Sequence, residues 1–177
     1  MTGERPLFWA AYSLGKKKGY PGVARLLLER GAQIEAVRIN GDNPLLWAVK
    51  NGSEQSAQVL LEHGANVNHQ DEIGITPLMA AISLDEEVPS LVQLLVKYKA
   101  DLHPRDNCQR TPLHIAVQRG YDHSARILMD AGADKSMVDG KGFTPQAYAR
   151  KGPKSVDVEV GWLALIAARR HINRTYN

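Results

Sequence analysis

The most regular feature of the chain is an apolar pattern that returns every 33 to 38 residues. Its clearest copy is RTPLHIAVQRG, residues 110–120, in which Leu113, Ala116 and Val117 are spaced i, i+3 and i+4. That spacing places the three side chains on one face of a helix, and a glycine directly afterwards favours a left-handed helix end. The pattern therefore predicts a short amphipathic helix that ends at Gly120.

Four further copies of this segment lie in register along the chain. They are RPLFWAA from residue 5, NPLLWAV from 43, TPLMAAI from 76 and TPQAYAR from 144, so the signature prolines are separated by 38, 33, 35 and 33 residues. A proline loses nothing at the first position of a helix, and a preceding Asn or Thr caps the helix through its side-chain oxygen. The capping residues are Asn43, Thr76, Thr111 and Thr144. We therefore expect five stacked units, each with an inner helix that begins at its proline.

A second apolar stripe follows in the first four units and predicts an outer helix. The stripes are Ala24-Leu27-Leu28, Ala57-Leu60-Leu61, Val92-Leu95-Val96 and Ala125-Leu128-Met129. Three residues later a glycine and an alanine mark a turn, except in the third unit, where Lys99 replaces the glycine. A left-handed conformation at Lys99 costs about 1 kcal/mol relative to glycine, so we expect the third unit to be locally weaker.

The units differ mainly in the connection between their two helices. The first, third and fifth units have long connections, SLGKKKGYPG, SLDEEVPS and RKGPKSVDVEVG. In the fifth unit we take Leu163, Ile166 and Ala167 as the outer stripe. The end units of a repeat array cap its core and are expected to be atypical.

With these segments in view, the chain resembles the ankyrin-repeat family. TPLHIA matches the family's Thr-Pro-Leu-His-x-Ala signature, and LLEHGANVN, residues 60–68, is similar to the end of its outer helix and the start of its loop. The resemblance implies one all-α domain over residues 1–177, an ankyrin-repeat solenoid of helix-turn-helix units with projecting hairpin-like loops. The predicted repeats span 5–42, 43–75, 76–110, 111–143 and 144–177.

Composition narrows the class of protein further. Cys108 is the only cysteine, so the chain can form neither an internal disulfide nor a thiolate zinc cage of its own. No segment has the apolar length of a secretion signal or a membrane span, and we expect a cytoplasmic or nuclear protein. Residues 1–103 carry ten Lys/Arg against twelve Asp/Glu, whereas 104–177 carry twelve against seven. A basic half favours acidic ligands or nucleic acid, but no aromatic residues alternate with these cations, so a solvated surface is preferred.

The residues with reactive side chains favour structure over catalysis. The resemblance gives His114 a hydrogen bond near the turn that ties neighbouring repeats, and no partner base or nucleophile stands near it in sequence. Cys108, His103 and Asp106 lack a recognised metal-ligand spacing. We therefore expect no catalytic residue, no metal and no cofactor. The alternative is an enzyme or small-molecule binder with a pocket in the concave groove around His103, Cys108 and Tyr12.

One position of the inner helices is often aromatic. It is occupied by Trp9, Trp47, Ala80, Ile115 and Tyr148 in the five units. The position lies beside the apolar stripe and aromatic rings supply large packing areas, so we expect packing in the core or between repeats. The alternative is an aromatic binding ridge.

Surface recognition is the function that the resemblance implies. Loop tips and the exposed sides of inner helices form a concave face in ankyrin-like proteins, and its contact positions map onto one set of residues here. These are Tyr12, Ile39, Asn40, Asp42, Lys50, Asn51, Glu72, Ile73, Ile75, Ser83, Asn107, Cys108, Arg110, Gln118, Arg119, Lys141 and Phe143. The resemblance also makes Asn68, in VNHQD, a candidate for hydroxylation by an asparaginyl hydroxylase.

The apolar members of this set carry the most weight. Ile39, Ile73, Ile75 and Phe143 stand in loops otherwise rich in polar residues, which is typical of an interface. Packing of each loop against the next is an equal alternative. Arg110 and Arg119 offer planar donors for a partner's carboxylate.

The expected function is therefore non-catalytic binding of another protein through the concave face. We expect a chain that is monomeric on its own and does not bind membranes. An enzyme or small-molecule binder ranks second, and a binder of acidic ligands or nucleic acid through the basic C-terminal half ranks third.

Overall fold

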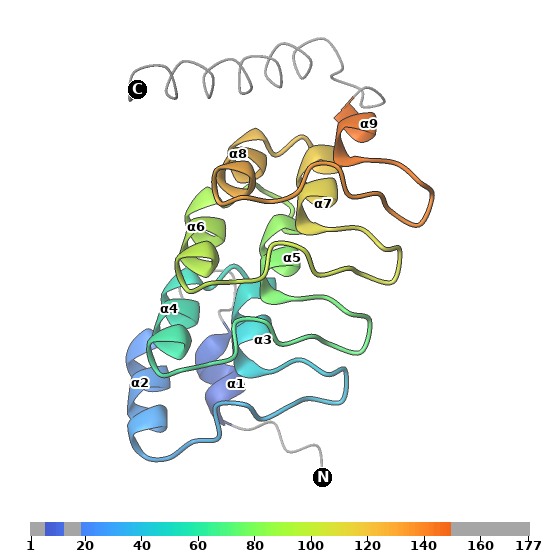
Figure 1. Cartoon of the computed structure of the whole chain (residues 1–177). Coiled ribbons are helices and arrows are strands. Elements are labelled where there is room, and N and C mark those ends of the chain that lie inside the picture. Colours follow the sequence, from blue (N-terminus) through green and yellow to red (C-terminus); the bar gives the residue numbers. More distant parts are fainter. Residues whose placement is uncertain (1–5, 13–18, 150–177) are drawn as a thin grey trace, which may run out of the picture.

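The structure is a stack of helix pairs with loops that project from one side (Figure 1). This computed structural model describes residues 6–12 and 19–149. Within them, the inner row of helices is α1 (Pro6–Ala11), α3 (Pro44–Lys50), α5 (Pro77–Ile82), α7 (Pro112–Arg119) and α9 (Pro145–Ala149). The outer row is α2 (Pro21–Glu29), α4 (Glu54–Glu62), α6 (Pro89–Lys97) and α8 (Asp122–Asp130). The predicted all-α repeat architecture is confirmed.

Each inner helix begins at its signature proline, as predicted. Leu46 N–H donates a hydrogen bond to Asn43 Oδ1 at 2.8 Å, and Met79 N–H donates to Thr76 Oγ1 at 3.3 Å. At the other end of α7, Gly120 has a φ of 71° and closes the helix. The capping side chains thus accept bonds from N–H groups that have no partner within the helix, and the left-handed glycine ends α7.

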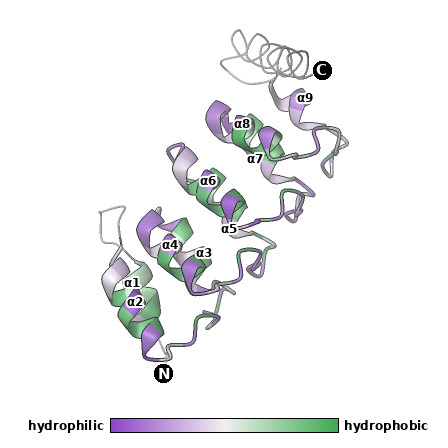
Figure 2. Cartoon of the chain, turned by 60° about the vertical axis from the view of Figure 1, so that its left-hand side comes forward, coloured by the Kyte–Doolittle hydropathy of each residue, from purple (hydrophilic) through white to green (hydrophobic). Residues whose placement is uncertain are grey.

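The predicted outer stripes form the core between the two rows of helices. Leu60, Leu95 and Leu128 occupy the same place in α4, α6 and α8, and none has exposed surface. Figure 2 shows the hydrophobic sides of paired helices facing one another, while the helix surfaces away from the pairs are more polar. Successive pairs also pack together, α3 against both α1 and α5, and α4 against both α2 and α6. An interior repeat is therefore covered on both sides.

The turn after each outer helix has the predicted left-handed backbone. Gly31 and Gly64 have φ values of 81° and 86°, and Lys99 has 65° in the same place. The lysine therefore bears the steric cost that glycine avoids. Gln109, in the loop before α7, is the second non-glycine residue with positive φ, at 60°, among the described residues.

The long connection of the third repeat is fastened to the fourth. The Leu84 carbonyl accepts bonds from Arg119 Nη1 at 3.1 Å and from the Tyr121 hydroxyl at 2.7 Å. Glu87 Oε1 accepts from Ser124 N–H at 2.7 Å. The long connection thus forms a contact between two repeats.

Some predicted features lie outside the described residues. These are most of the first connection, all of the fifth, and the stripe Leu163, Ile166 and Ala167. In the described part of the chain, no helix is both long and apolar enough to span a bilayer.

Candidate binding face

Four loops join successive repeats and project beside the inner helices (Figure 1). They comprise residues 37–43, 70–76, 105–111 and 138–144, and we call these loops together with the exposed sides of the inner helices the inner face. Each loop is closed by a backbone bond across its turn, for example from Asp139 N–H to the Phe143 carbonyl at 2.9 Å. The loops are therefore ordered turns.

A buried aspartate holds three of the four loops. Asp71 Oδ1 accepts from the N–H groups of Ile73 and Ile75 at 3.1 and 2.8 Å. Asp106 and Asp139 make the same two bonds to the residues two and four positions later, at 2.8 to 2.9 Å. A buried carboxylate that accepts two backbone N–H groups fixes the turn around it. Sequence reasoning missed this role, although each aspartate stands six residues before a signature proline.

The first loop uses a different arrangement. Arg38 stands where the other loops have aspartate, and its guanidinium carbon lies 4.0 Å from the centre of the Trp47 ring. Asn40 takes over the turn, because its side chain accepts from Asp42 N–H at 3.3 Å and donates to Asp42 Oδ2 at 2.8 Å. The positive charge is thus placed against an aromatic ring.

Lys50 joins the first two loops from the end of α3. Its Nζ donates to Asp42 Oδ1 at 2.6 Å and to Asp71 Oδ2 at 2.8 Å. Burial alone would lower the pKa of Lys50, but these hydrogen bonds outweigh it and the pKa is raised. Asp42 has no exposed surface. Both residues, expected as partner contacts, serve bonds within the chain, and Asp42 offers a partner no surface.

Arg110 holds the third loop, residues 105–111, in a similar way. Arg110 Nε and Nη2 donate to Asp106 Oδ2 at 2.9 and 2.7 Å, and Nη1 donates to Gln118 Oε1 at 3.0 Å. Burial opposes the charge, but the bond to Asp106 raises the pKa of Arg110. Arg110 therefore meets a carboxylate, as its chemistry suggested, but one of its own loop.

Asp139 is bound by Tyr148 of α9. The hydroxyl donates to Asp139 Oδ2 at 2.5 Å and lowers the pKa of this carboxyl from 3.8 to about 2. The same bond raises the pKa of Tyr148.

Two isoleucines of the inner face are open to solvent. Ile39 is 97% exposed and Ile73 is 57% exposed. Ile75 instead packs against the core, and Phe143 is partly buried with its ring edge-on to that of Tyr148, 6.1 Å between centres. The structure thus divides the four predicted anchors into two exposed and two packed residues.

Further exposed apolar side chains occur where the first and last loops begin. Val37 is 60% exposed and Val138 is 44% exposed. Neither was singled out from the sequence, because a single valine in a polar loop is common.

Aromatic side chains gather where α1 meets α3. The rings of Tyr12 and Trp47 are stacked, 6.0 Å between centres, and Trp9 lies edge-on to Tyr12 at 6.3 Å. With Phe8 and Arg38 they line a hollow of about 220 Å³. Ala80 and Ile115 are buried as predicted, but the packing prediction is wrong for Trp9, which is 54% exposed. No described repeat precedes Trp9 and covers it.

His114 has the predicted structural role. Thr111 N–H donates to its Nδ1 at 3.1 Å, so the ring proton is on Nε2, which donates to the Phe143 carbonyl at 3.0 Å. The side chain is fully buried. This desolvation lowers the pKa of His114, and the bond to Phe143 offsets it only in part. A neutral imidazole therefore ties the fourth repeat to the fifth.

The predicted alternative site around Cys108 is not assembled. Cys108 is exposed at a loop tip, and His103 accepts a bond from Asp134 N–H at 3.0 Å. Tyr12 follows α1, two repeats away from that loop (Figure 1). Within residues 6–12 and 19–149, no group of three or more His, Cys, Asp or Glu side chains is arranged to hold a metal ion.

The other predicted contact residues lie at loop tips or helix ends. Asn40, Glu72, Asn107, Lys141, Gln118 and Arg119 are exposed, whereas Tyr12, Asn51 and Ser83 are partly buried. Asn51 donates to the Trp47 carbonyl at 2.7 Å. Asn68 is exposed, and its Oδ1 accepts from Asp101 N–H at 2.8 Å, which joins consecutive turns. Its hydroxylation stays a prediction.

Stacked helix pairs with projecting, aspartate-held loops define a repeat solenoid. A family model described as "Ankyrin repeats (3 copies)" matches residues 1–71 and 65–139. The chain belongs to the ankyrin-repeat family. Domains of this family are generally protein–protein interaction modules and are typically non-catalytic.

Individual relatives are longer than this chain. It is 31% identical over 139 residues to "E3 ubiquitin-protein ligase KEG" of Arabidopsis thaliana, covering 77% of this chain and 9% of that protein. It is 34% identical over 113 residues to "Putative ankyrin repeat protein YahD" of Escherichia coli, covering 62% and 56%. It is 44% identical over 95 residues to "B-cell lymphoma 3 protein homolog" of Mus musculus, covering 53% and 21%. The chain thus spans less than two thirds of each relative.

Proposed function

We propose that this chain binds another protein through the inner face, with Ile39 and Ile73 as apolar anchors. The observation that carries the proposal is that these two exposed side chains stand on ordered loops. An ordered loop loses little conformational entropy on binding, so the apolar area it presents contributes efficiently to affinity. The free energy of binding then comes from burying side chains that the fold itself does not bury.

The aromatic hollow extends this surface toward α1. Its lining by Trp9, Tyr12, Trp47 and Arg38 combines the residue types that contribute most at protein interfaces. We assign the hollow to one large apolar side chain of the partner, next to the loop that carries Ile39. Lys50 and Arg110 contribute to binding indirectly, because their hydrogen bonds to Asp71 and Asp106 fix the conformation of the loops.

A test compares three variants of the immobilised chain as bait in quantitative affinity capture. Ile39→Arg and Ile73→Arg place a charge on the anchors, and Gln93→Arg places it on the exposed side of α6 as a control. We expect one set of proteins to be captured by the unchanged chain and by Gln93→Arg, and lost from both isoleucine variants. A purified member of that set should bind the isoleucine variants at least about ten-fold more weakly. Equal capture by all four baits contradicts the proposal.

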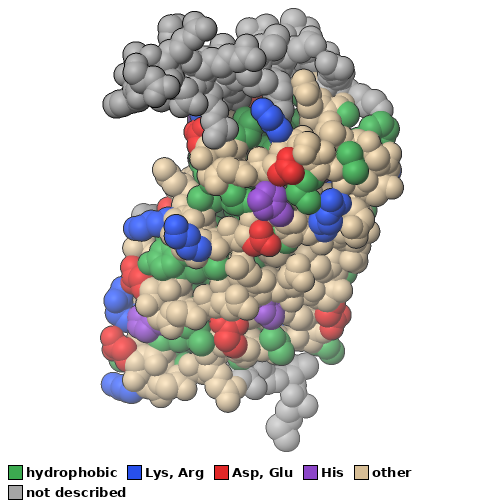
Figure 3. Space-filling model, viewed as in Figure 1, with side chains coloured by type: hydrophobic (Ala, Val, Ile, Leu, Met, Phe, Trp, Pro, Cys, Tyr) green, Lys and Arg blue, Asp and Glu red, His purple; other side chains and the backbone are tan. Residues whose placement is uncertain are grey.

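The nucleic-acid alternative gains no support from the described surface. In Figure 3, acidic and basic side chains are interspersed on the face in view. Arg105 and Arg119 donate to backbone carbonyls, and Arg110 to a carboxylate of its own loop. Binding to duplex DNA that weakens steeply with added salt would revive this alternative.

A further inference from the structure

Neighbouring loops of the inner face are joined by backbone hydrogen bonds at one recurring position. Glu72 N–H donates to the Asn40 carbonyl at 3.5 Å, which joins the second loop to the first. Gly140 N–H donates to the Cys108 carbonyl at 3.0 Å, which joins the fourth loop to the third. Each donor stands five residues before its signature proline, and each acceptor stands four residues before the preceding one. This register predicts the same bond between the second and third loops.

The second and third loops lack that bond. In the register of the repeats, its donor would be Asn107 N–H and its acceptor the Ile73 carbonyl. Neither group makes a hydrogen bond within the described part of the chain. Both residues are exposed, so one backbone donor and one backbone acceptor stand side by side at an accessible surface. We call these two groups the open pair.

The step between these two loops is also wider than the step before it. A methyl group placed on Gly41 of the first loop would lie 2.8 Å from the Glu72 nitrogen. One placed on Gly74, the equivalent residue of the second loop, would approach the third loop only to 3.5 Å, at the carbonyl oxygen of Arg105. The missing bond therefore coincides with a real separation of the loops.

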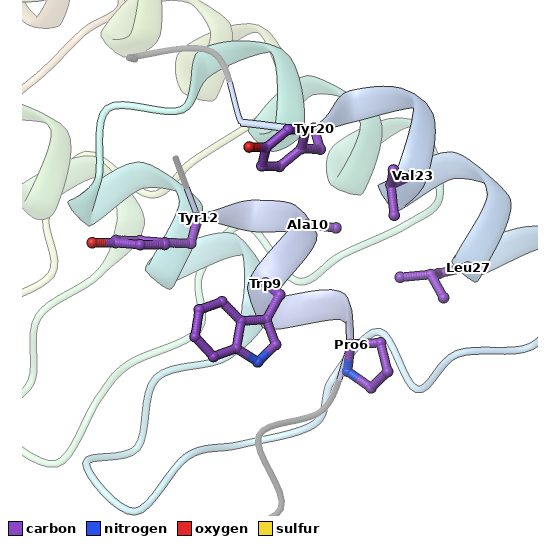
Figure 4. Close-up of a pocket in the computed structure, with 7 residues that line it drawn as sticks. All are labelled: Pro6, Trp9, Ala10, Tyr12, Tyr20, Val23 and Leu27. Atoms are coloured by element: carbon purple, nitrogen blue, oxygen red, sulfur yellow. The ribbon is translucent and has the colours of Figure 1, made fainter. Parts of the chain in front are cut away.

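The open pair lies within the row of loops and not at its end. The second and third loops each have a neighbouring loop on both sides (Figure 1). The hollow of about 480 Å³ in Figure 4 lies elsewhere, on α1 and α2, where Pro6, Trp9 and Tyr20 are among the residues that line it. The open pair is thus a break in an otherwise continuous surface.

We propose that the open pair binds the backbone of an extended segment of the partner protein. The inference rests on the proposed function and names the kind of partner that the inner face takes. A residue in a strand directs its own N–H and C=O to the same side, so one residue can donate to the Ile73 carbonyl and accept from Asn107 N–H. Pairing of main-chain groups with an extended peptide is a common mode of recognition.

The position of the apolar anchor favours a backbone over an isolated amide. The Ile73 side chain is 57% exposed and belongs to the residue that supplies the acceptor. A backbone bound at this carbonyl therefore brings a side chain of the partner within reach of Ile73. An Asn or Gln side chain of the partner would make the same two hydrogen bonds without burying the anchor.

Asn107→Pro removes the donor and suits the conformation of the loop. Gln109 N–H donates to the Asp106 carbonyl at 2.7 Å, so Asn107 is the second residue of a β-turn, a position that favours proline. Asp106 Oδ1 accepts from the N–H groups of Cys108 and Arg110, and both bonds remain. Asn107→Ala is the matched control, because it removes the side chain and keeps the N–H. Urea unfolding should show that both variants are folded.

The probe is a peptide selected from a random-sequence phage library against the unchanged chain. Peptides that no longer bind Ile73→Arg are those that occupy the inner face. For such a peptide, Asn107→Ala should leave the dissociation constant unchanged within about two-fold, and Asn107→Pro should raise it about five-fold, the effect of one net hydrogen bond. Equal dissociation constants for the two variants overturn the inference and leave the proposed function intact. A selection without any peptide that depends on Ile73 counts against the proposed function itself.

Methylation of the peptide's backbone nitrogens tests the acceptor without changing the protein. At one position, where the peptide N–H donates to the Ile73 carbonyl, an N-methyl group should raise the dissociation constant about five-fold. A peptide that tolerates methylation at every nitrogen overturns the inference. Loss of binding on replacement of its Asn or Gln would then identify the ligand of the open pair as a side-chain amide.

Discussion

Replacement of His114 by methionine isolates the tie between the fourth and fifth repeats. Leu46 and Met79 occupy the place of His114 in α3 and α5 and are as fully buried, so methionine suits the shape of the site. His114→Met keeps most of the apolar packing and removes the bonds to Thr111 and to the Phe143 carbonyl. The variant therefore reports on hydrogen bonding with little loss of volume.

The expected cost follows from the groups left without partners. A net hydrogen bond contributes about 1 kcal/mol, and a buried group left unsatisfied costs about 1–3 kcal/mol. With two backbone groups affected, His114→Met should lower the free energy of unfolding by about 2 kcal/mol. His114→Ala should lower it by about 4 kcal/mol, because it also leaves a cavity. Urea unfolding followed by circular dichroism at pH 7.5 measures both values.

The pH dependence gives an independent check on the same residue. Burial lowers the pKa of His114 below its ordinary value of 6.5, so the unfolded chain binds this proton more readily than the folded chain does. The contribution is therefore complete above pH 6.5 and is lost as the pH falls below it toward the folded pKa. The difference in stability between the unchanged chain and His114→Met should shrink over that window. Equal stability of the two at pH 7.5, or a difference independent of pH, would refute the structural role.

Three further changes test the turns and the loop network. Lys99→Gly should raise the free energy of unfolding by about 1 kcal/mol, because φ is 65° there, and a neutral or destabilising result in urea unfolding argues against the strain. Lys50→Met should lower the free energy of unfolding by about 2 kcal/mol in the same assay, because Asp42 and Asp71 lose the cation that they share. The Lys50 side chain is 30% exposed, so the cost is smaller than for a fully buried ion pair. The pKa of about 2 for Asp139 gives stability that is present above pH 3.8 and lost as the pH falls below it. Tyr148→Phe should therefore lose less stability between pH 5 and pH 2 in thermal melts, and a profile like that of the unchanged chain would count against the bond between Tyr148 and Asp139.

The sequence was sufficient for the features that repeat locally. A proline at the first helical position, a capping side chain before it and an apolar stripe after it are decided within one turn of helix, so the helix starts were correct. Lys99 was recognised as a strained residue because glycine fills the same place in the other units. Gln109 was missed, although Gly74 and Gly142 hold the equivalent place in neighbouring loops.

The loop network could not be derived because its partners are far apart in sequence. Lys50 lies 21 residues from Asp71, and nothing in the local pattern of α3 indicates that its last residue points to the next loop. Arg38 of the first loop stands where the other loops have aspartate, so a search for periodic residues does not find the arrangement of this loop. Exposure of Trp9 depends on the absence of a helix pair before it among the described residues, which the residue type alone does not encode.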